Sequence, residues 1–217
     1  YEALKAHSEG VICLSACLAG HLPQLILQRR FDEADALALK MKDMFAPGDF
    51  YLELQDHGLE EQKLVNSYLI DLAERIGVKL VATNDVHYTY AVDVKPHDIL
   101  LCLQTGKRLE DEDRMRYEGG QYFVKSPEEM ERLFPYAKQA LENTQKNADR
   151  CNVEIEFGVT KLPKYDVPEG YTSWEYLNKL CREGFAGRYP DDDGTLRKQL
   201  EYELSIIQKM GYVDYFL

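Results

Sequence analysis

The chain has 217 residues, 45% of them hydrophobic, and a formal net charge of −12. This length suits one large domain or one and a half ordinary ones, and the composition is that of a packed globular protein rather than a disordered one. The negative charge argues against a general DNA- or RNA-binding surface, which needs clustered Lys and Arg, although an acidic metal site could still act on nucleic acid.

The cysteine and hydropathy patterns indicate a reducing compartment. Five Cys without C-x-x-C spacing predict free thiols, and no apolar run approaches the ~20 residues of a membrane helix. No signal peptide is recognisable at the start, so we expect a cytoplasmic protein without a membrane partner. Because the chain starts without Met and stops as an apolar segment begins, we also expect it to be a fragment.

The first half of the chain alternates strand and helix patterns. Short apolar runs bounded by polar residues or glycine are typical of buried strands, whereas apolar residues three and four apart predict amphipathic helices. Gly77 follows a long helical pattern and predicts its C-cap. The order strand–helix–strand–helix–strand predicts a parallel sheet or barrel of β/α units. We expect strands at 11–14, 49–54 and 78–82, and helices at 22–28, 31–45 and 59–76.

The second half is predicted to be mainly helical. The segment 126–129 combines an N-cap Ser, a Pro and an acid at the third helical position, which predicts a helix start. The charged segment 106–120 is interpreted as a surface loop, in which Arg114 and Arg116 form solvated ion pairs with neighbouring acidic residues. An extended linker is expected at 162–170, because its prolines exclude a helix. Further helices are expected at 96–104, from 126, at 137–151, 173–182 and 195–210.

Side chains of the kinds that bind metals follow the predicted strands. Asp85 and His87 come just after strand 78–82, and in an extended segment residues two apart point to the same side. A carboxylate and an imidazole together bind borderline cations such as zinc or manganese. Cys17 after the first strand adds a thiolate, and Glu53 lies at the second strand. In a parallel barrel, functional side chains lie together at the carboxyl ends of the strands.

Each candidate also has a structural interpretation. Free Cys is most often a small buried hydrophobe, which would account for Cys17 without a metal. Asp85 could be a turn or N-cap carboxylate, and His87 a satisfied polar residue at a rim. The sequence contains no Gly-rich phosphate loop, nucleophile elbow or paired-Cys zinc motif. The remaining histidines are interpreted as mainly structural: His7, His21, His57 and His97.

Several sequence blocks resemble one family. The segments 10–20, 50–58 and 80–88 are similar to the later part of the PHP (polymerase and histidinol phosphatase) domain of bacterial replicative DNA polymerase III alpha subunits, which are C-family polymerases. The resemblance continues in the same order over most of the chain, and ordered blocks are more specific than any single motif. These further blocks are 97–106, 125–130, 143–144, 151–153 and 210–217.

The resemblance implies an α/β fold: a partial distorted β/α barrel of PHP type, followed by a mainly helical segment that enters the polymerase palm. Residues 1–150 would be the C-terminal part of the PHP domain and residues 151–217 the start of the palm region. The character of the sequence changes between Cys151 and Pro163, where we place the domain boundary.

The family's metal site implies roles for three residues of this chain. Its Cys, Asp and His ligands fall on Cys17, Asp85 and His87, and the implied cofactor is zinc or manganese. The other ligands, including a His-x-His pair, are expected before Tyr1. The polymerase aspartates, which bind magnesium, are expected after Leu217. Both centres are therefore expected to be incomplete in this chain, which would carry no catalytic polymerase residue.

The function implied by the resemblance is that of part of a DNA-directed DNA polymerase, a nucleotidyltransferase of chromosomal replication. Its PHP site could act as a 3′–5′ exonuclease or phosphoesterase. The implied partners are DNA, deoxynucleotides, a sliding clamp and a proofreading subunit. Two alternatives stay open: a non-catalytic PHP scaffold that stabilises the polymerase and docks a proofreading subunit, and a stand-alone PHP phosphoesterase. The palm-like block at 151–217 argues against the stand-alone enzyme.

Overall fold

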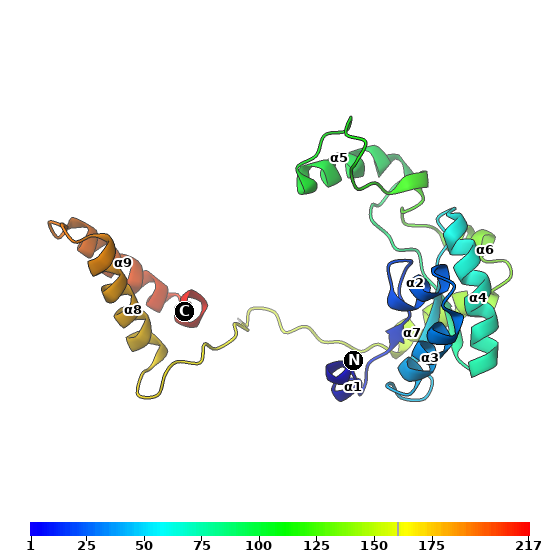
Figure 1. Cartoon of the computed structure of the whole chain (residues 1–217), viewed down its shortest axis with the longest axis horizontal. Helices are drawn as coiled ribbons and strands as arrows, with labels where there is room; N and C mark the ends of the chain where they lie inside the picture. Colours follow the sequence, from blue (N-terminus) through cyan, green and yellow to red (C-terminus); the bar gives the residue numbers. More distant parts are fainter. Residues whose placement is uncertain (160) are drawn as a thin grey trace. The chain divides into compact units, whose positions relative to one another are not determined.

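The structure, a computed structural model, describes residues 1–159 and 161–217. It contains two compact units, Tyr1–Val153 and Glu154–Leu217, which Figure 1 colours along the sequence. In the described part of the chain, no helix is both long enough and apolar enough to cross a membrane.

A three-stranded parallel sheet forms the centre of the first unit. Its strands β1 (Cys13–Leu14), β2 (Phe50–Leu54) and β3 (Lys79–Ala82) are arranged in the order β1-β2-β3. The central strand β2 is almost entirely buried, as expected for an apolar strand covered on both faces. The predicted α/β class and the parallel β/α order are confirmed.

Three helices pack around the sheet: α2 (His21–Leu27), α3 (Phe31–Lys42) and α4 (Glu60–Ile76). Helix α2 packs against both α3 and α4, and α4 packs against β2 and β3 (Figure 1). Helix α4 ends where the sequence predicts, at Gly77, whose φ of 64° is the left-handed conformation of a helix C-cap. The core between these elements includes the fully buried side chains Ile26, Leu52, Leu54, Leu69 and Leu72.

Helix α7 (Lys138–Arg150) covers the outer edge of β3. The Asn143 amide donates a hydrogen bond to the Leu80 carbonyl (2.8 Å), and the Thr144 hydroxyl donates one to the Ala82 carbonyl (2.7 Å). These carbonyls lie on the side of β3 that faces away from β2, so the helix supplies donors that a neighbouring strand would otherwise provide.

Two helices of this unit precede α7 in the sequence. Helix α6 (Pro127–Leu133) starts with the predicted capping box, in which Ser126 Oγ accepts from the Glu129 amide and the Glu129 carboxylate accepts from the Ser126 amide. Helix α5 (Val94–Thr105) begins two residues before its predicted start and stands apart from the helices around the sheet in Figure 1. The sequence did not predict the short helix α1 (Glu2–Ala6).

The segment 106–120 folds back onto α5 and ends in a 3₁₀ turn, η2 (Glu118–Gly120). The Arg114 side chain is only 5% exposed, and its Nη2 donates to the Asp98 carboxylate at 2.7 Å. The interpretation of Arg114 as a solvated residue is therefore wrong, because the returning chain covers its guanidinium. Arg116 donates instead to the Asp111 carbonyl (2.8 Å).

The second unit is helical, as predicted, with α8 (Ser173–Arg188), α9 (Thr195–Lys209) and α10 (Val213–Phe216). Helix α8 is longer than the sequence indicates. Asp214 accepts hydrogen bonds from the Ser173 hydroxyl (2.7 Å) and from the Tyr165 amide (3.2 Å), and these bonds join α10 to the start of α8 and to the chain before it.

Candidate functional site

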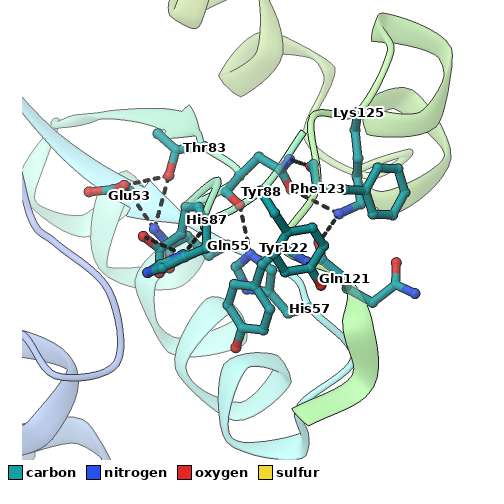
Figure 2. A network of polar contacts seen from close by, with 12 residues as sticks. Glu53, Gln55, His57, Thr83, His87, Tyr88, Gln121, Tyr122, Phe123 and Lys125 are labelled. Atoms are coloured by element: carbon teal, nitrogen blue, oxygen red, sulfur yellow. Dashed lines mark hydrogen bonds and ion pairs between the residues drawn. The ribbon is translucent and has the colours of Figure 1, made fainter. Parts of the chain in front are cut away.

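Glu53 connects the loops that follow the three strands. From the end region of β2, its Oε1 accepts from the Thr83 hydroxyl and from the Gln55 amide (3.1 Å) (Figure 2). Its Oε2 accepts from the Ala16 amide (3.0 Å). Both carboxylate oxygens are therefore occupied. In this arrangement Glu53 supports the site by holding the loops after β1 and β3 against β2.

The backbone has a left-handed conformation at two positions, one next to a predicted ligand and one at a predicted ligand. Ala16, which precedes Cys17, has φ 71°, and Asp85 has φ 43°. Among the described non-glycine residues only Arg29 shares this feature. Such conformations cost about 1–3 kcal/mol and are found preferentially at functional sites. The expectation of an extended segment after β3 is wrong, because the chain turns at Asp85.

Cys17 lies in a tight turn between β1 and α2. An ideal Cβ on Gly20 would lie 2.9 Å from Ala16 Cβ and 3.0 Å from the Cys17 carbonyl, so a side chain would open this turn. The Cys17 residue is partly buried and lines a small cavity of about 10 Å³ with Glu53 and Gln55. That volume holds about one water molecule. The turn therefore holds the Cys17 backbone in the loop that follows β1, next to Glu53.

The Asp85 and His87 side chains lie close together after β3. His87 Nδ1 is 2.7 Å from the Asp85 carbonyl oxygen and 4.0 Å from Asp85 Oδ1. A carbonyl oxygen can only accept, so Nδ1 carries the proton in this contact and Nε2 keeps its lone pair. Metal-binding imidazoles are commonly oriented by this type of hydrogen bond. The turn thus gives His87 the tautomer of a ligand.

His57 is a structural residue, which agrees with the interpretation of its sequence. The residue is 2% exposed, its Nε2 donates to the Asn84 carbonyl (2.8 Å), and its Nδ1 accepts from the Gln62 amide (2.8 Å). Burial lowers the pKa of the imidazole, and the hydrogen bond to Asn84 opposes this effect. Since both ring nitrogens are engaged, His57 joins the loops after β2 and β3 as a neutral side chain.

A cluster of aromatic rings surrounds His87. Tyr117 lies 4.2 Å from His87 and 4.9 Å from Tyr122 between ring centroids, and His97 lies 5.7 Å from His87. Tyr122 stacks on His57 at 4.0 Å, close to the polar contacts drawn in Figure 2. Sequence reasoning missed both tyrosines, because Tyr117 comes from a segment without recognisable periodicity. Only the folded chain brings them to the strand ends.

The predicted ligands influence both of these tyrosines. Burial raises the pKa of Tyr117 and of Tyr122, and the charges of Asp85 and Cys17 raise each pKa further. Both phenols therefore keep their protons at neutral pH.

The donor chemistry matches part of a metal site. The oriented imidazole of His87 and the carboxylate of Asp85 are suitable ligands for zinc or manganese. Among the described residues, no group of three or more His, Cys, Asp or Glu side chains is placed to hold a metal ion. That Cys17 shares a cation with Asp85 and His87 stays a prediction.

Comparisons with known families match both ends of the chain. Residues 1–57 match the family described as PHP domain, and residues 175–217 match the bacterial DNA polymerase III alpha NTPase domain. The chain therefore combines sequence from a PHP domain with sequence from a bacterial polymerase subunit. The assignment of residues 1–150 to the PHP domain and of 151–217 to the palm stays a prediction.

Relatives identify the family. The chain is 42% identical over 217 residues to the DNA polymerase III subunit alpha of Treponema pallidum, and this match covers the whole chain and 18% of that protein. It is 42% identical over 218 residues to the Borreliella burgdorferi subunit, with 100% of this chain and 19% of that protein covered. For the Thermus aquaticus subunit the identity is 40% over 197 residues, with 88% and 16% covered. The predicted family is confirmed: over its whole length the chain corresponds to a segment of bacterial DNA polymerase III alpha subunits, and it spans about a fifth of their length.

Proposed function

We propose that this chain is part of a DNA-directed DNA polymerase that acts in chromosomal replication. The observation that carries the proposal is the match over the full chain to DNA polymerase III alpha subunits at 42% identity. The complete protein would act on DNA and deoxynucleoside triphosphates, use magnesium at a polymerase centre outside this chain, and bind a sliding clamp and a proofreading subunit.

Primer extension by the complete polypeptide that contains this sequence tests the proposal. We expect template-dependent incorporation of deoxynucleotides that requires magnesium. Pull-down of the same polypeptide with a sliding clamp and with a separate proofreading exonuclease tests the proposed partners. A purified, folded polypeptide that extends no primer would contradict the polymerase function.

We further propose that Cys17, Asp85 and His87 form part of a PHP metal site that binds zinc or manganese. Three observations support it: the 4.0 Å approach of Asp85 to His87, the Nδ1 contact that orients His87, and the left-handed turns beside Cys17 and at Asp85. Asp85 would anchor the cation, His87 would bind through Nε2, and Cys17 would bind as a thiolate and release its proton.

A bound cation would act as a Lewis acid toward a phosphoester and would lower the pKa of a bound water. The residues of this chain would hold the ligands of the cation in position. Glu53 holds the loops together, the Asp85 carbonyl fixes the His87 tautomer, and His57 holds Asn84 next to Asp85. The activity that this arrangement supports best is phosphodiester hydrolysis, in particular 3′–5′ exonuclease activity.

Metal analysis of the complete polypeptide tests this site. Asp85→Ala and His87→Ala are each expected to reduce the bound zinc or manganese per molecule, whereas His7→Ala, at an exposed position, should leave it unchanged. Equal stoichiometry in all variants would refute the assignment. A wild-type polypeptide that binds neither metal but still extends primers would favour the alternative of a non-catalytic PHP scaffold.

A further inference from the structure

Two tyrosine hydroxyls at the strand ends have no hydrogen-bond partner among the described residues: those of Tyr117 and Tyr122. Two other tyrosines of this unit differ: the Tyr88 hydroxyl accepts from the Tyr122 amide (3.2 Å), and the Tyr68 hydroxyl donates to Asp35 (2.8 Å). In the described chain the fully buried side-chain polar atoms without a partner belong to Gln55 and Asn147. The Tyr117 and Tyr122 hydroxyls therefore reach solvent.

The rings that carry these hydroxyls are held in place. Tyr122 is 6% exposed and lies parallel to the His57 ring, with an interplanar angle of 8°. The Tyr117 ring stands at 87° to Tyr122 and also packs on His87. Two residues after Tyr117, Gly119 has φ 81° and approaches the His57 carbonyl, with an ideal Cβ only 3.3 Å away. The backbone and both rings therefore fix the positions of the hydroxyls before any ligand binds.

The hydroxyls also share surroundings with the proposed ligands. The His87 ring lies 4.2 Å from the Tyr117 ring and 5.6 Å from the Tyr122 ring, measured between ring centroids. A neutral phenol with a free hydroxyl is a hydrogen-bond donor. Two such donors, fixed beside a site that holds a divalent cation, suit an oxygen-rich anion that the cation also attracts. Phosphoryl oxygens have this chemistry.

We propose that Tyr117 and Tyr122 donate hydrogen bonds to a nonbridging phosphoryl oxygen of the substrate, and so are substrate-contacting residues of the PHP site. This inference rests on the proposed metal site, because the cation offsets the negative charge of Asp85 and Cys17. It assigns a role in substrate binding to the segment 106–120, which delivers Tyr117, and to the chain that leads into α6, which delivers Tyr122.

The test uses inorganic phosphate as the probe and the complete polypeptide saturated with manganese. Phosphate affinity is measured by isothermal titration, and Asp85→Ala, which should lose the cation, defines the binding that belongs to other sites. Tyr117→Phe and Tyr122→Phe keep the rings and remove only the donors. Each is expected to weaken phosphate binding at this site about tenfold, the usual effect of losing one hydrogen bond to a charged group.

Two controls separate this inference from the proposed site. Tyr90→Phe removes a hydroxyl from a side chain that is 68% exposed, and it should bind phosphate as the wild type does. Manganese binding, measured separately, should be unchanged in Tyr117→Phe and Tyr122→Phe. Manganese bound with equal phosphate affinity in wild type and both Phe variants would overturn the inference alone. Failure of the wild type to bind manganese or zinc would overturn the metal site and the inference with it.

Discussion

His57 shows how a histidine that lies near a candidate site can be excluded as a ligand. Both of its ring nitrogens take part in hydrogen bonds, with the Asn84 carbonyl on one side and the Gln62 amide on the other. A metal ion would have to displace one of these contacts and leave a buried polar group without a partner, which costs about 1–3 kcal/mol. Among the described residues the His87 ring makes a hydrogen bond only through Nδ1, so a metal ion at Nε2 would not have this cost.

The burial of neutral His57 predicts a pH dependence of stability. Its pKa in the folded chain lies below the ordinary value of 6.5, so the unfolded chain takes up the proton more readily. The stabilisation is therefore present above about pH 6.5 and is lost as the pH falls through the lowered pKa of the folded state. His57→Gln, which cannot be protonated, should be less stable than wild type by about 1–2 kcal/mol at pH 8.

Urea unfolding at pH 5, 6, 7 and 8, followed by far-UV circular dichroism, measures this difference. The gap between wild type and His57→Gln should narrow toward pH 5, because only the wild type loses this contribution. His7→Gln, at an exposed position, is the matched control and should follow the wild type at every pH. A gap that stays constant from pH 8 to pH 5 would contradict the assignment of a neutral, buried imidazole.

The sequence predicted the candidate site only in part, for a physical reason. Asp85, His87 and Cys17 could be proposed because residues just after parallel strands gather at one edge of a sheet. Tyr117 could not be proposed, because its position depends on the partly buried contact of Arg114 with Asp98 and on the backbone at Gly119. Such contacts join residues far apart in the sequence and leave no periodic signal.

Helix α7 illustrates a similar limit for whole elements. Its amphipathic pattern predicted a helix, and the structure has α7 at Lys138–Arg150. The pattern did not show that its polar residues Asn143 and Thr144 face the sheet. They do so because the edge carbonyls of β3 need donors, which apolar side chains could not supply. Local periodicity thus identified the helix, while the sheet edge decided which of its polar side chains point toward β3.

Removing these donors should destabilise the first unit. Asn143 is 4% exposed, so Asn143→Ala would leave the Leu80 carbonyl without its partner and lower the free energy of unfolding by about 2 kcal/mol. Thr144→Val keeps the shape of the side chain and loses one hydrogen bond, for a loss of about 1 kcal/mol. Urea unfolding followed by circular dichroism measures both. Gln145→Ala, an exposed neighbour on the same helix, should change stability by less than about 0.5 kcal/mol; an equal effect of all three would contradict the role of the edge.

At the scale of the whole molecule, charge constrains how this segment could work in a polymerase. The net charge is −12, and carboxylates outnumber basic side chains in each of the two units. Duplex DNA is bound mainly through its phosphates, and each phosphate contact by Lys or Arg adds to the salt dependence of binding. An acidic segment therefore contributes little to holding a duplex, and we infer that other parts of the complete protein make those contacts.

The isolated chain should accordingly bind duplex DNA weakly and with little dependence on salt. Fluorescence anisotropy with a labelled 20-base-pair duplex is measured in metal-free buffer at about 50 and 200 mM salt. We expect a dissociation constant weaker than about 100 μM at both concentrations, beyond the weak end of the usual range for non-specific binding. A protein that makes many phosphate contacts would instead lose about a thousandfold in affinity over this interval. Tight binding at low salt that falls steeply at high salt would show that this segment has a basic contact surface despite its overall charge, and that it takes part in holding the duplex.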